Sequence, residues 1–242
     1  MSVWIQNIVH QNSTISSLLD SLRVYYTLDE GSGDFVDYVN SYNLSVTGSP
    51  IRTAGKINNC VNFNNGANYL ERANGNNFSP GNAEISLSMW INFNNLPSVT
   101  GHRSRIFGVY SVVDTSWFSS VMIQTDMSTN RLMFWITSTA PNNDVVYSDV
   151  IPSAGVWYHY VFISRIGDIC IYRNNSDVSY GKSLSRSTNI TPSTSWGRFG
   201  LSHSSYYADL LLDEVAIWDR FLDVSEIDYL FNSENGRSVP FN

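Results

Sequence analysis

The residues best suited to chemistry are an adjacent carboxyl pair, Asp213 and Glu214, inside an apolar run near the C-terminus. Retaining glycoside hydrolases hold two carboxyl groups about 5 Å apart, which a strand achieves with carboxylates at alternate positions on one face. Adjacent residues of a regular strand point to opposite faces. The spacing therefore argues against paired-carboxylate hydrolysis, and we expect a structural role for the pair and no enzymatic activity.

Other catalytic and metal patterns are also missing from the sequence. There is no Gly-x-Ser-x-Gly nucleophile elbow, and no two histidines are spaced i, i+4 as in a zinc-binding helix. A Ser-His-Asp triad assembled from distant positions stays open, because such triads are defined by geometry and not by sequence order. His159 lies in a strand-like run, where we expect it to fill a structural place.

Composition argues against nucleic-acid binding and membrane insertion. The net charge is −7 and there is no basic run, whereas phosphate backbones are bound by clustered Lys and Arg. No apolar run reaches the length of a membrane span, and the first residues do not read as a signal peptide. We therefore expect a protein that stays inside the cell when made or is exported without such a signal. Cys60 and Cys170 are interpreted as buried thiols, with a disulfide as the alternative.

The elements that must position these residues are mostly strands. Residues 84–93 alternate apolar and polar side chains, as a half-buried strand does. Asn64-Asn65-Gly66 and residues 165–168 each predict a hairpin turn. Apolar residues at helical spacing predict a short helix over residues 13–22. Asp223 and Glu226 have the spacing of a capping box, which predicts a final helix.

Together these segments predict an all-β protein. About a dozen short strands separated by Asn, Gly, Ser and Pro turns are typical of an antiparallel sandwich. We divide the chain into an N-terminal arm and short helix, residues 1–22, and one sandwich, residues 23–242.

Several motifs, in this order, resemble the laminin-G-like (concanavalin A-like lectin/glucanase) jelly-roll family. They are Tyr26 to Gly33, Val36-Asp37, Gly55-Lys56 through Phe63, Ile85 to Ile91, Trp157-Tyr158-His159 and Leu211 to Leu222. The resemblance covers roughly residues 20–235. It implies an antiparallel jelly-roll sandwich, with the short N-terminal arm and a short C-terminal helix added to it.

The resemblance also implies a structural calcium ion at the rim of the sandwich. Asp37 and Asp213 occupy the matching positions, and Asn43 adds a side-chain carbonyl oxygen, which suits a hard cation. Residues 38–42 lack the glycines usual in this loop of the family, which weakens any coordination by backbone carbonyls. The alternative is that Asp37 caps its own loop and Asp213 bonds nearby backbone.

Sugar binding through loop aromatics is a recurrent use of the family. The candidates here are Trp117, Phe118, Trp196, Tyr206 and Tyr207. The alternative for each is packing at the edge of the sandwich.

These observations favour a non-catalytic display or adhesion protein, most simply a decoration or fibre-type protein on a phage virion surface. Its apolar arm, with Trp4, Ile5 and Ile8, would contact other virion or surface proteins, and its loops would bind glycans. An exported bacterial carbohydrate-binding lectin or adhesin, extracellular or on the cell surface, is the alternative. A glycoside hydrolase ranks third because the carboxylate pattern is missing.

Overall fold

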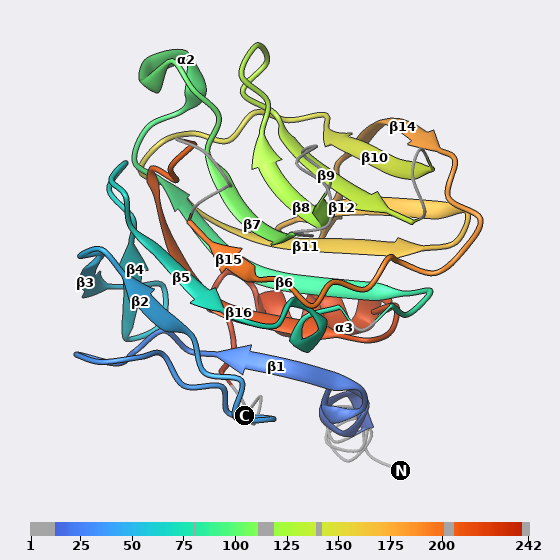
Figure 1. The fold of residues 1–242 in the computed structure, drawn as a ribbon, viewed down its shortest axis with the longest axis horizontal. Coiled ribbons are helices and arrows are strands. Elements are labelled where there is room, and N and C mark those ends of the chain that lie inside the picture. Colours follow the sequence, from blue (N-terminus) through green and yellow to red (C-terminus); the bar gives the residue numbers. More distant parts are fainter. Residues whose placement is uncertain (1–12, 80, 111–118, 139–141, 201–205, 239–242) are drawn as a thin grey trace.

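The computed structural model describes residues 13–79, 81–110, 119–138, 142–200 and 206–238. Two antiparallel sheets pack face to face, which confirms the predicted all-β sandwich (Figure 1). Sheet 1 contains β1 (Leu22–Tyr26), β3 (Ile51–Ala54), β4 (Asn59–Asn62), β6 (Ile85–Phe93), β11 (Trp157–Arg165), β12 (Asp168–Arg173), β13 (Ser176–Asp177) and β16 (Leu210–Trp218). Sheet 2 contains β2 (Ser45–Thr47), β5 (Tyr69–Arg72), β7 (Arg105–Tyr110), β8 (Ser119–Thr125), β9 (Leu132–Thr137), β10 (Asn143–Ser148), β14 (Ser179–Leu184) and β15 (Gly197–Phe199).

Helical segments are short. They are residues 13–19, η1 (Gly75–Asn77), α2 (Pro97–Thr100) and α3 (Val224–Phe231). The predicted N-terminal helix ends at residue 19, so Leu22 begins β1, and Leu19 is exposed while Leu18 is buried. Among the described helices, none has the length and apolar character needed to cross a membrane.

Strand β16 lies in the middle of sheet 1. It pairs with β6 on one side along most of its length. On the other side its neighbour changes, from β4 opposite Leu211 and Leu212 to β1 opposite Val215 and the residues after it. A β-bulge interrupts the pairing with β6 between Asp213 and Ala216. The bulge therefore coincides with the point where one neighbouring strand replaces another.

The main core fills the space between the sheets. On β6 the predicted alternation is confirmed, because Ile85, Leu87, Met89, Ile91 and Phe93 are all buried there. The other face of β6 is buried too, beneath a second apolar cluster that includes Leu18, Trp218, Ile227 and Leu230. Since Ile227 and Leu230 belong to α3, this helix and residues 13–19 cover the outer face of sheet 1.

Helix α3 begins with the capping box predicted from the sequence. The Asp223 side chain accepts the Glu226 N–H, and the Glu226 side chain accepts the Asp223 N–H. Two buried residues of the helix, Ile227 and Leu230, face the sheet. A local cap and an apolar face thus suffice to place this helix.

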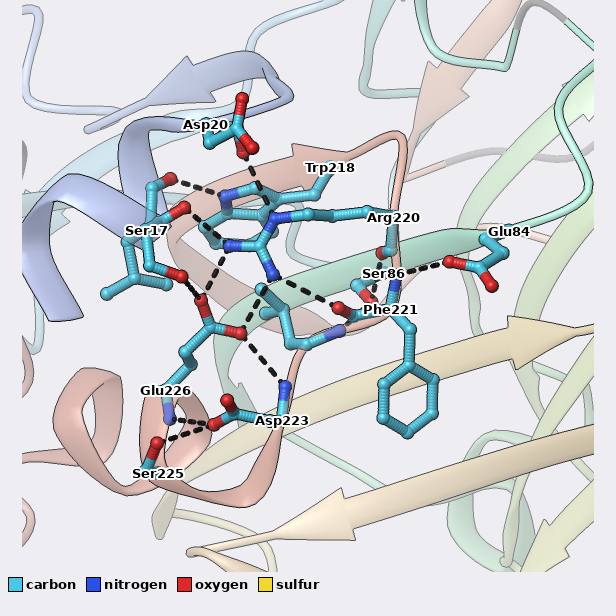
Figure 2. A network of polar contacts seen from close by, with 12 residues as sticks. Ser17, Asp20, Glu84, Ser86, Trp218, Arg220, Phe221, Asp223, Ser225 and Glu226 are labelled. Carbon is cyan, nitrogen blue, oxygen red and sulfur yellow. Dashed lines mark hydrogen bonds and ion pairs between the residues drawn. The ribbon is translucent and has the colours of Figure 1, made fainter. Parts of the chain in front are cut away.

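An arginine joins the two ends of the chain next to α3. The Arg220 guanidinium donates to both carboxylate oxygens of Glu226, at 2.8 and 2.6 Å, and to the Ser17 carbonyl oxygen at 2.6 Å (Figure 2). Trp218 Nε1 donates to the Leu18 carbonyl oxygen at 2.7 Å. Arg220, Glu226, Ser17 and Trp218 form what we call the terminal clamp, which ties the N-terminal helical residues to the end of β16.

One predicted hairpin is wrong. β4 and β5, which flank Asn64-Asn65-Gly66, belong to different sheets. Asn64 and Asn65 have positive φ, and the backbone N–H groups of Phe63 and Asn65 bond to Leu210 and Ala208. The turn therefore carries the chain across the sandwich. The second predicted hairpin, between β11 and β12, is confirmed, and both cysteines are buried free thiols.

Candidate functional site

The carboxyl pair lies on one face of sheet 1, so the prediction of opposite faces is wrong. Leu212 and Val215 both point into the main core, and the intervening bulge, with Glu214 at φ 51°, turns Asp213 and Glu214 to the outer side. A bulge places one extra residue on its strand and breaks the alternation of side chains. The pair lies where β4 ends and β1 begins along β16.

Each carboxyl group of the pair bonds a different segment of the chain next to β16. Asp213 Oδ2 accepts the Lys56 and Ile57 N–H groups of the β3–β4 turn, at 2.8 and 3.0 Å. A Cβ at Gly55 would lie 2.6 Å from this oxygen, so glycine lets the turn approach. Glu214 accepts from the Tyr25 hydroxyl of β1 and from Ser238 Oγ. The pair thus joins β16 to the β3–β4 turn, to β1 and to the C-terminal segment.

Burial controls the ionisation of both groups. It raises the pKa of Asp213 to about 8, and the backbone donors oppose this only in part. It also raises the pKa of Glu214 to about 7. Asp213 is fully buried and Glu214 is 4% exposed. A substrate has no access to carboxyl groups in this position, so the arrangement supports the structural role expected from the sequence.

A serine–histidine pair lies beside Glu214. His159 Nε2 is 2.8 Å from Ser88 Oγ, and both residues line a cavity of about 10 Å³ together with Tyr25, Trp90 and Glu214. Burial lowers the pKa of His159 to about 3, so the imidazole is neutral. A cavity of this size holds at most one water molecule. The buried, hydrogen-bonded His159 is therefore consistent with the structural role that we expect from the sequence.

The loop that contains Asp37 is organised by hydrogen bonds. Asp37 Oδ1 accepts the N–H groups of Tyr25 and Val39, and Oδ2 accepts those of Asn40 and Tyr42. Asn43 Oδ1 accepts the Asp37 N–H at 3.0 Å. These contacts correspond to the alternative stated above, in which Asp37 caps its own loop and ties it to β1.

The residues predicted to hold calcium do not fit a cation in this arrangement. Four N–H donors use the acceptor positions of the Asp37 carboxylate, and Asp213 bonds a different turn. Within the described part of the chain, no three His, Cys, Asp or Glu side chains converge as a metal site. Calcium binding at these residues stays a prediction from the sequence.

The aromatic candidates for sugar binding fall at different places. Trp117 and Phe118 lie outside the described residues, as do Trp4, Ile5 and Ile8 of the predicted arm. Trp196 precedes β15 and lies beside Tyr110, at the end of β7. Tyr206 lies against Arg105, at the start of β7, and Tyr207 follows it, partly buried. The structure thus places Trp196 and Tyr206 at opposite ends of one strand.

Trp196 belongs to a group of side chains on the outer face of sheet 2. The Arg198 guanidinium lies 3.8 Å from the Trp196 ring centroid and 4.6 Å from that of Tyr69, and Arg198 Nε donates to Glu71 at 2.6 Å. The Tyr110 ring is 5.9 Å from Trp196. We call Trp196, Arg198, Glu71, Tyr69 and Tyr110 the Trp196 cluster. Its strands, β5, β15 and β7, are neighbours in the sheet (Figure 1).

Arg198 and Glu71 are not among the site residues predicted from the sequence. Arg198 precedes the core residue Phe199, and Glu71 follows the core residue Leu70, so alternation alone would have placed both on the outer face. What the sequence could not supply is that β15 lies between β5 and β7, because these strands are far apart along the chain.

Comparison with known proteins gives a family model and a set of similar folds. The model for the concanavalin A-like lectin/glucanases superfamily matches residues 64–228. No curated protein sequence matches the chain.

Three solved structures illustrate the likeness. The binding domain of paraclostridial mosquitocidal protein 1 is 17% identical with a TM-score of 0.71, covering 89% of this chain and 53% of that one. Domain 4 of an extracellular arabinanase from Geobacillus stearothermophilus, in complex with arabinotriose, is 18% identical with a TM-score of 0.66, covering 86% and 97%. The binding domain of botulinum neurotoxin DC, in complex with SialylT, is 16% identical with a TM-score of 0.64, covering 90% and 52%.

The likeness to these structures shows a shared fold. The chain spans about half the length of the two toxin binding domains, and nearly all of the arabinanase domain.

Proposed function

Because the chain belongs to the concanavalin A-like lectin/glucanase superfamily, we propose that it is a non-catalytic carbohydrate-binding module. Its sandwich is lectin-like, and similar folds occur in the arabinanase domain in complex with arabinotriose and in the neurotoxin binding domain in complex with SialylT. The observation that carries the proposal is the Trp196 cluster, which combines a partly exposed tryptophan with charged hydrogen-bonding groups on an outer sheet face.

The chemistry of the Trp196 cluster suits a sugar. An aromatic ring offers an apolar face to the C–H side of a pyranose, and the polar groups around it fix the orientation of the hydroxyls. Arg198 stacks on Trp196 and is in turn held by Glu71, so the tryptophan is already oriented. Preorganisation of this kind reduces the entropy lost on binding.

We propose a non-catalytic protein because the carboxyl pair is not accessible to a substrate. Asp213 and Glu214 are buried and bonded to structural partners. Incubation with the glycans that bind should release no reducing sugar, and measurable hydrolysis would contradict this part of the proposal.

A glycan array followed by calorimetric titration of the best ligand tests the binding. We expect Trp196→Ala to weaken binding on the order of tenfold or more. Trp157→Ala is the matched control, because Trp157 is a partly buried tryptophan on sheet 1 and should change affinity less than twofold. Unchanged affinity in Trp196→Ala would move the site elsewhere, and an array without any bound glycan would contradict the proposed function.

The proposal extends to display on a virion surface. It is supported by the acidic composition and by the apolar residues Trp4, Ile5 and Ile8, which suit contact with another protein. Deletion of residues 1–12 should release the protein from its particle without lowering the melting temperature of the sandwich. Retained incorporation would contradict it, and recovery of the protein from bacterial cell surfaces would favour the alternative of an exported adhesin.

A further inference from the structure

A cysteine and a lysine connect the two sheets at one edge of the sandwich. Cys170 lies in β12 of sheet 1 between the core residues Ile169 and Ile171, so its side chain is on the outer face. Lys182 lies in β14, the strand at one end of sheet 2. The two strands are adjacent, and Ser179 Oγ of β14 accepts the Ile171 N–H of β12 at 2.9 Å. Residues of different sheets are therefore in direct contact here.

The amine of Lys182 lies against the sulfur of Cys170. The distance from Lys182 Nζ to Cys170 Sγ is 3.2 Å, and the distance from Nζ to Asp168 Oδ1 is 2.9 Å. The thiol is also 3.6 Å from Asp168 Oδ1, and the same carboxylate forms a longer ion pair with Arg165, at 3.7 Å. A thiol, an amine and a carboxylate are thus in mutual contact, with the nitrogen and sulfur atoms close enough to react with each other.

This group of side chains is open to small solutes on one side. The side chains of Lys182 and Asp168 are 32% and 31% exposed. Cys170 retains 6% of its surface, whereas Cys60 is fully buried. Both cysteines are free thiols, but only Cys170 lies beneath partly exposed polar groups. An oxidant close to water in size therefore has a route to Cys170.

We infer that Cys170 and Lys182 form an oxidative modification site, at which hydrogen peroxide joins them through a sulfur–nitrogen bond. In the first step the thiol takes one oxygen from the peroxide. The O–O bond breaks, the sulfur is oxidised to a sulfenic acid, and the peroxide is reduced to water.

In the second step the sulfenic acid condenses with the amine, as sulfenic acids do with thiols and with nitrogen. The Lys182 nitrogen bonds the sulfur and the S–O bond breaks. One ammonium proton leaves with the hydroxyl group as water, and another passes through the Asp168 carboxylate to solvent. The product is a neutral sulfenamide between β12 and β14.

The surroundings of the thiol set the conditions for this reaction. Burial raises the pKa of Cys170, and the neighbouring Lys182 opposes this only in part. The thiolate, which is the reactive form, is therefore a minor species at neutral pH. We expect the link to form in excess peroxide and to be absent from protein kept under reducing conditions.

The link ties the edge of sheet 1 to the edge of sheet 2. Because it closes a loop in the unfolded chain, it should raise the melting temperature on the order of 3–5 °C. This effect is independent of the proposed saccharide binding, since β14 and β15, which follows Trp196, are not neighbours in sheet 2.

Peptide mass spectrometry of the peroxide-treated full chain tests the inference. Arg173 lies between the two residues, so trypsin places Cys170 and Lys182 on separate peptides unless they are linked. We expect a joined peptide that is lighter than the sum of its two parts by the mass of two hydrogen atoms, and that dithiothreitol separates. The same treatment should raise the melting temperature, and the reductant should reverse the rise.

Two variants serve as controls. Lys182→Arg keeps a positive charge beside Asp168 but replaces the amine with a guanidinium, which is a poor nucleophile, so it should give neither the joined peptide nor the rise in melting temperature. Cys60→Ser should give both, because Cys60 takes no part.

Four outcomes would overturn the inference. They are oxidation of Cys170 to a sulfinic acid without a joined peptide, an unmodified Cys170 in excess peroxide, a disulfide between Cys60 and Cys170, and an equal rise in melting temperature in Lys182→Arg. None of them bears on glycan binding, so the proposed function is tested separately.

Discussion

At the scale of single residues, Asp213 and Glu214 bring two acidic groups into the protein interior. They do so where β16 changes its neighbour from β4 to β1, and their hydrogen bonds fill the gap between those strands. Burial favours the protonated forms, so their raised pKa values connect the stability of the fold to pH.

We expect stability to fall as the pH rises from about 4 to about 8. The pKa values in the folded state, about 8 for Asp213 and about 7 for Glu214, exceed the ordinary values of 3.8 and 4.5. The folded state therefore binds more protons across this window, and unfolding becomes easier as the pH rises. Urea denaturation should show a loss on the order of 2–5 kcal/mol between pH 5 and pH 8.5.

Substitution of Asp213 tests whether this carboxyl group causes the loss of stability at high pH. Asp213→Asn keeps an acceptor for the Lys56 and Ile57 N–H groups and removes the charge, so its profile should be flatter and its stability at pH 8.5 higher than that of the parent. Asp34→Asn, at an exposed position, should leave the profile unchanged. A profile for Asp213→Asn that overlays the parent would refute the assignment.

Lowering the pH into the acidic range destabilises the fold through other carboxylates. Burial acts to raise the pKa values of Asp126, Asp168, Asp223 and Glu226, but hydrogen bonds and neighbouring charges outweigh it and lower them. The stability that they contribute is present above their ordinary pKa values and is lost as the pH falls below them.

At the scale of elements, the terminal clamp is the clearest source of stability outside the core. The Glu226 side chain is 3% exposed and its charge is balanced by Arg220. Removing one member of such a pair leaves a charge without its partner, which typically costs more than the pair itself contributes.

We therefore expect Arg220→Met to lower the free energy of unfolding by about 2–4 kcal/mol at pH 7. Adding Glu226→Gln should recover part of this loss, because it removes the unpaired charge. Arg165→Met is the comparison: its ion pair with Asp168 is 3.7 Å long and 49% exposed on the arginine side, so the change should cost less than about 1 kcal/mol. Equal losses at both arginines in urea denaturation would argue against the clamp.

The contribution of the capping box at the N-terminus of α3 can be measured separately. Asp223→Ala removes the side-chain acceptor of the capping box and should cost about 1 kcal/mol, whereas Asp223→Asn should cost clearly less, since asparagine caps comparably. Identical costs for the two variants in urea denaturation would show that the charge and not the cap is responsible.

The Asp37 loop gives the test for calcium. Because its carboxylate already accepts four N–H groups, we expect excess EGTA to leave the melting temperature unchanged and elemental analysis to find no bound metal. A lower melting temperature in chelator, restored by added calcium, would instead support the ion predicted from the sequence at Asp37, Asn43 and Asp213.

At the scale of the whole molecule, the sequence predicted correctly those structural features that depend on residues close together in the chain. The alternation in β6 and the capping box of α3 each depend on residues close together in the chain. The bulge at Asp213 lies where β4 is replaced by β1 as the neighbour of β16. The turn at Asn64-Asn65 crosses between the sheets because β4 and β5 belong to different sheets. Neither arrangement can be read from nearby residues. The Trp196 cluster likewise depends on strand neighbours that are distant in sequence, which is why alternation alone predicted candidate residues and not a site.

The position of β16 also has a consequence for biosynthesis. The strand that completes the middle of sheet 1 follows its partners β1, β4 and β6 in the chain, and it is the last strand among the described residues. Until the ribosome has made β16, these partner strands have apolar faces and open edges without their central neighbour, which exposes them to aggregation. The nascent chain therefore cannot close sheet 1 in stages from its N-terminus. The native topology of sheet 1 becomes accessible only after β16 has been made. Because pairing of such distant segments is slow, protection of the unfinished chain is part of producing this protein.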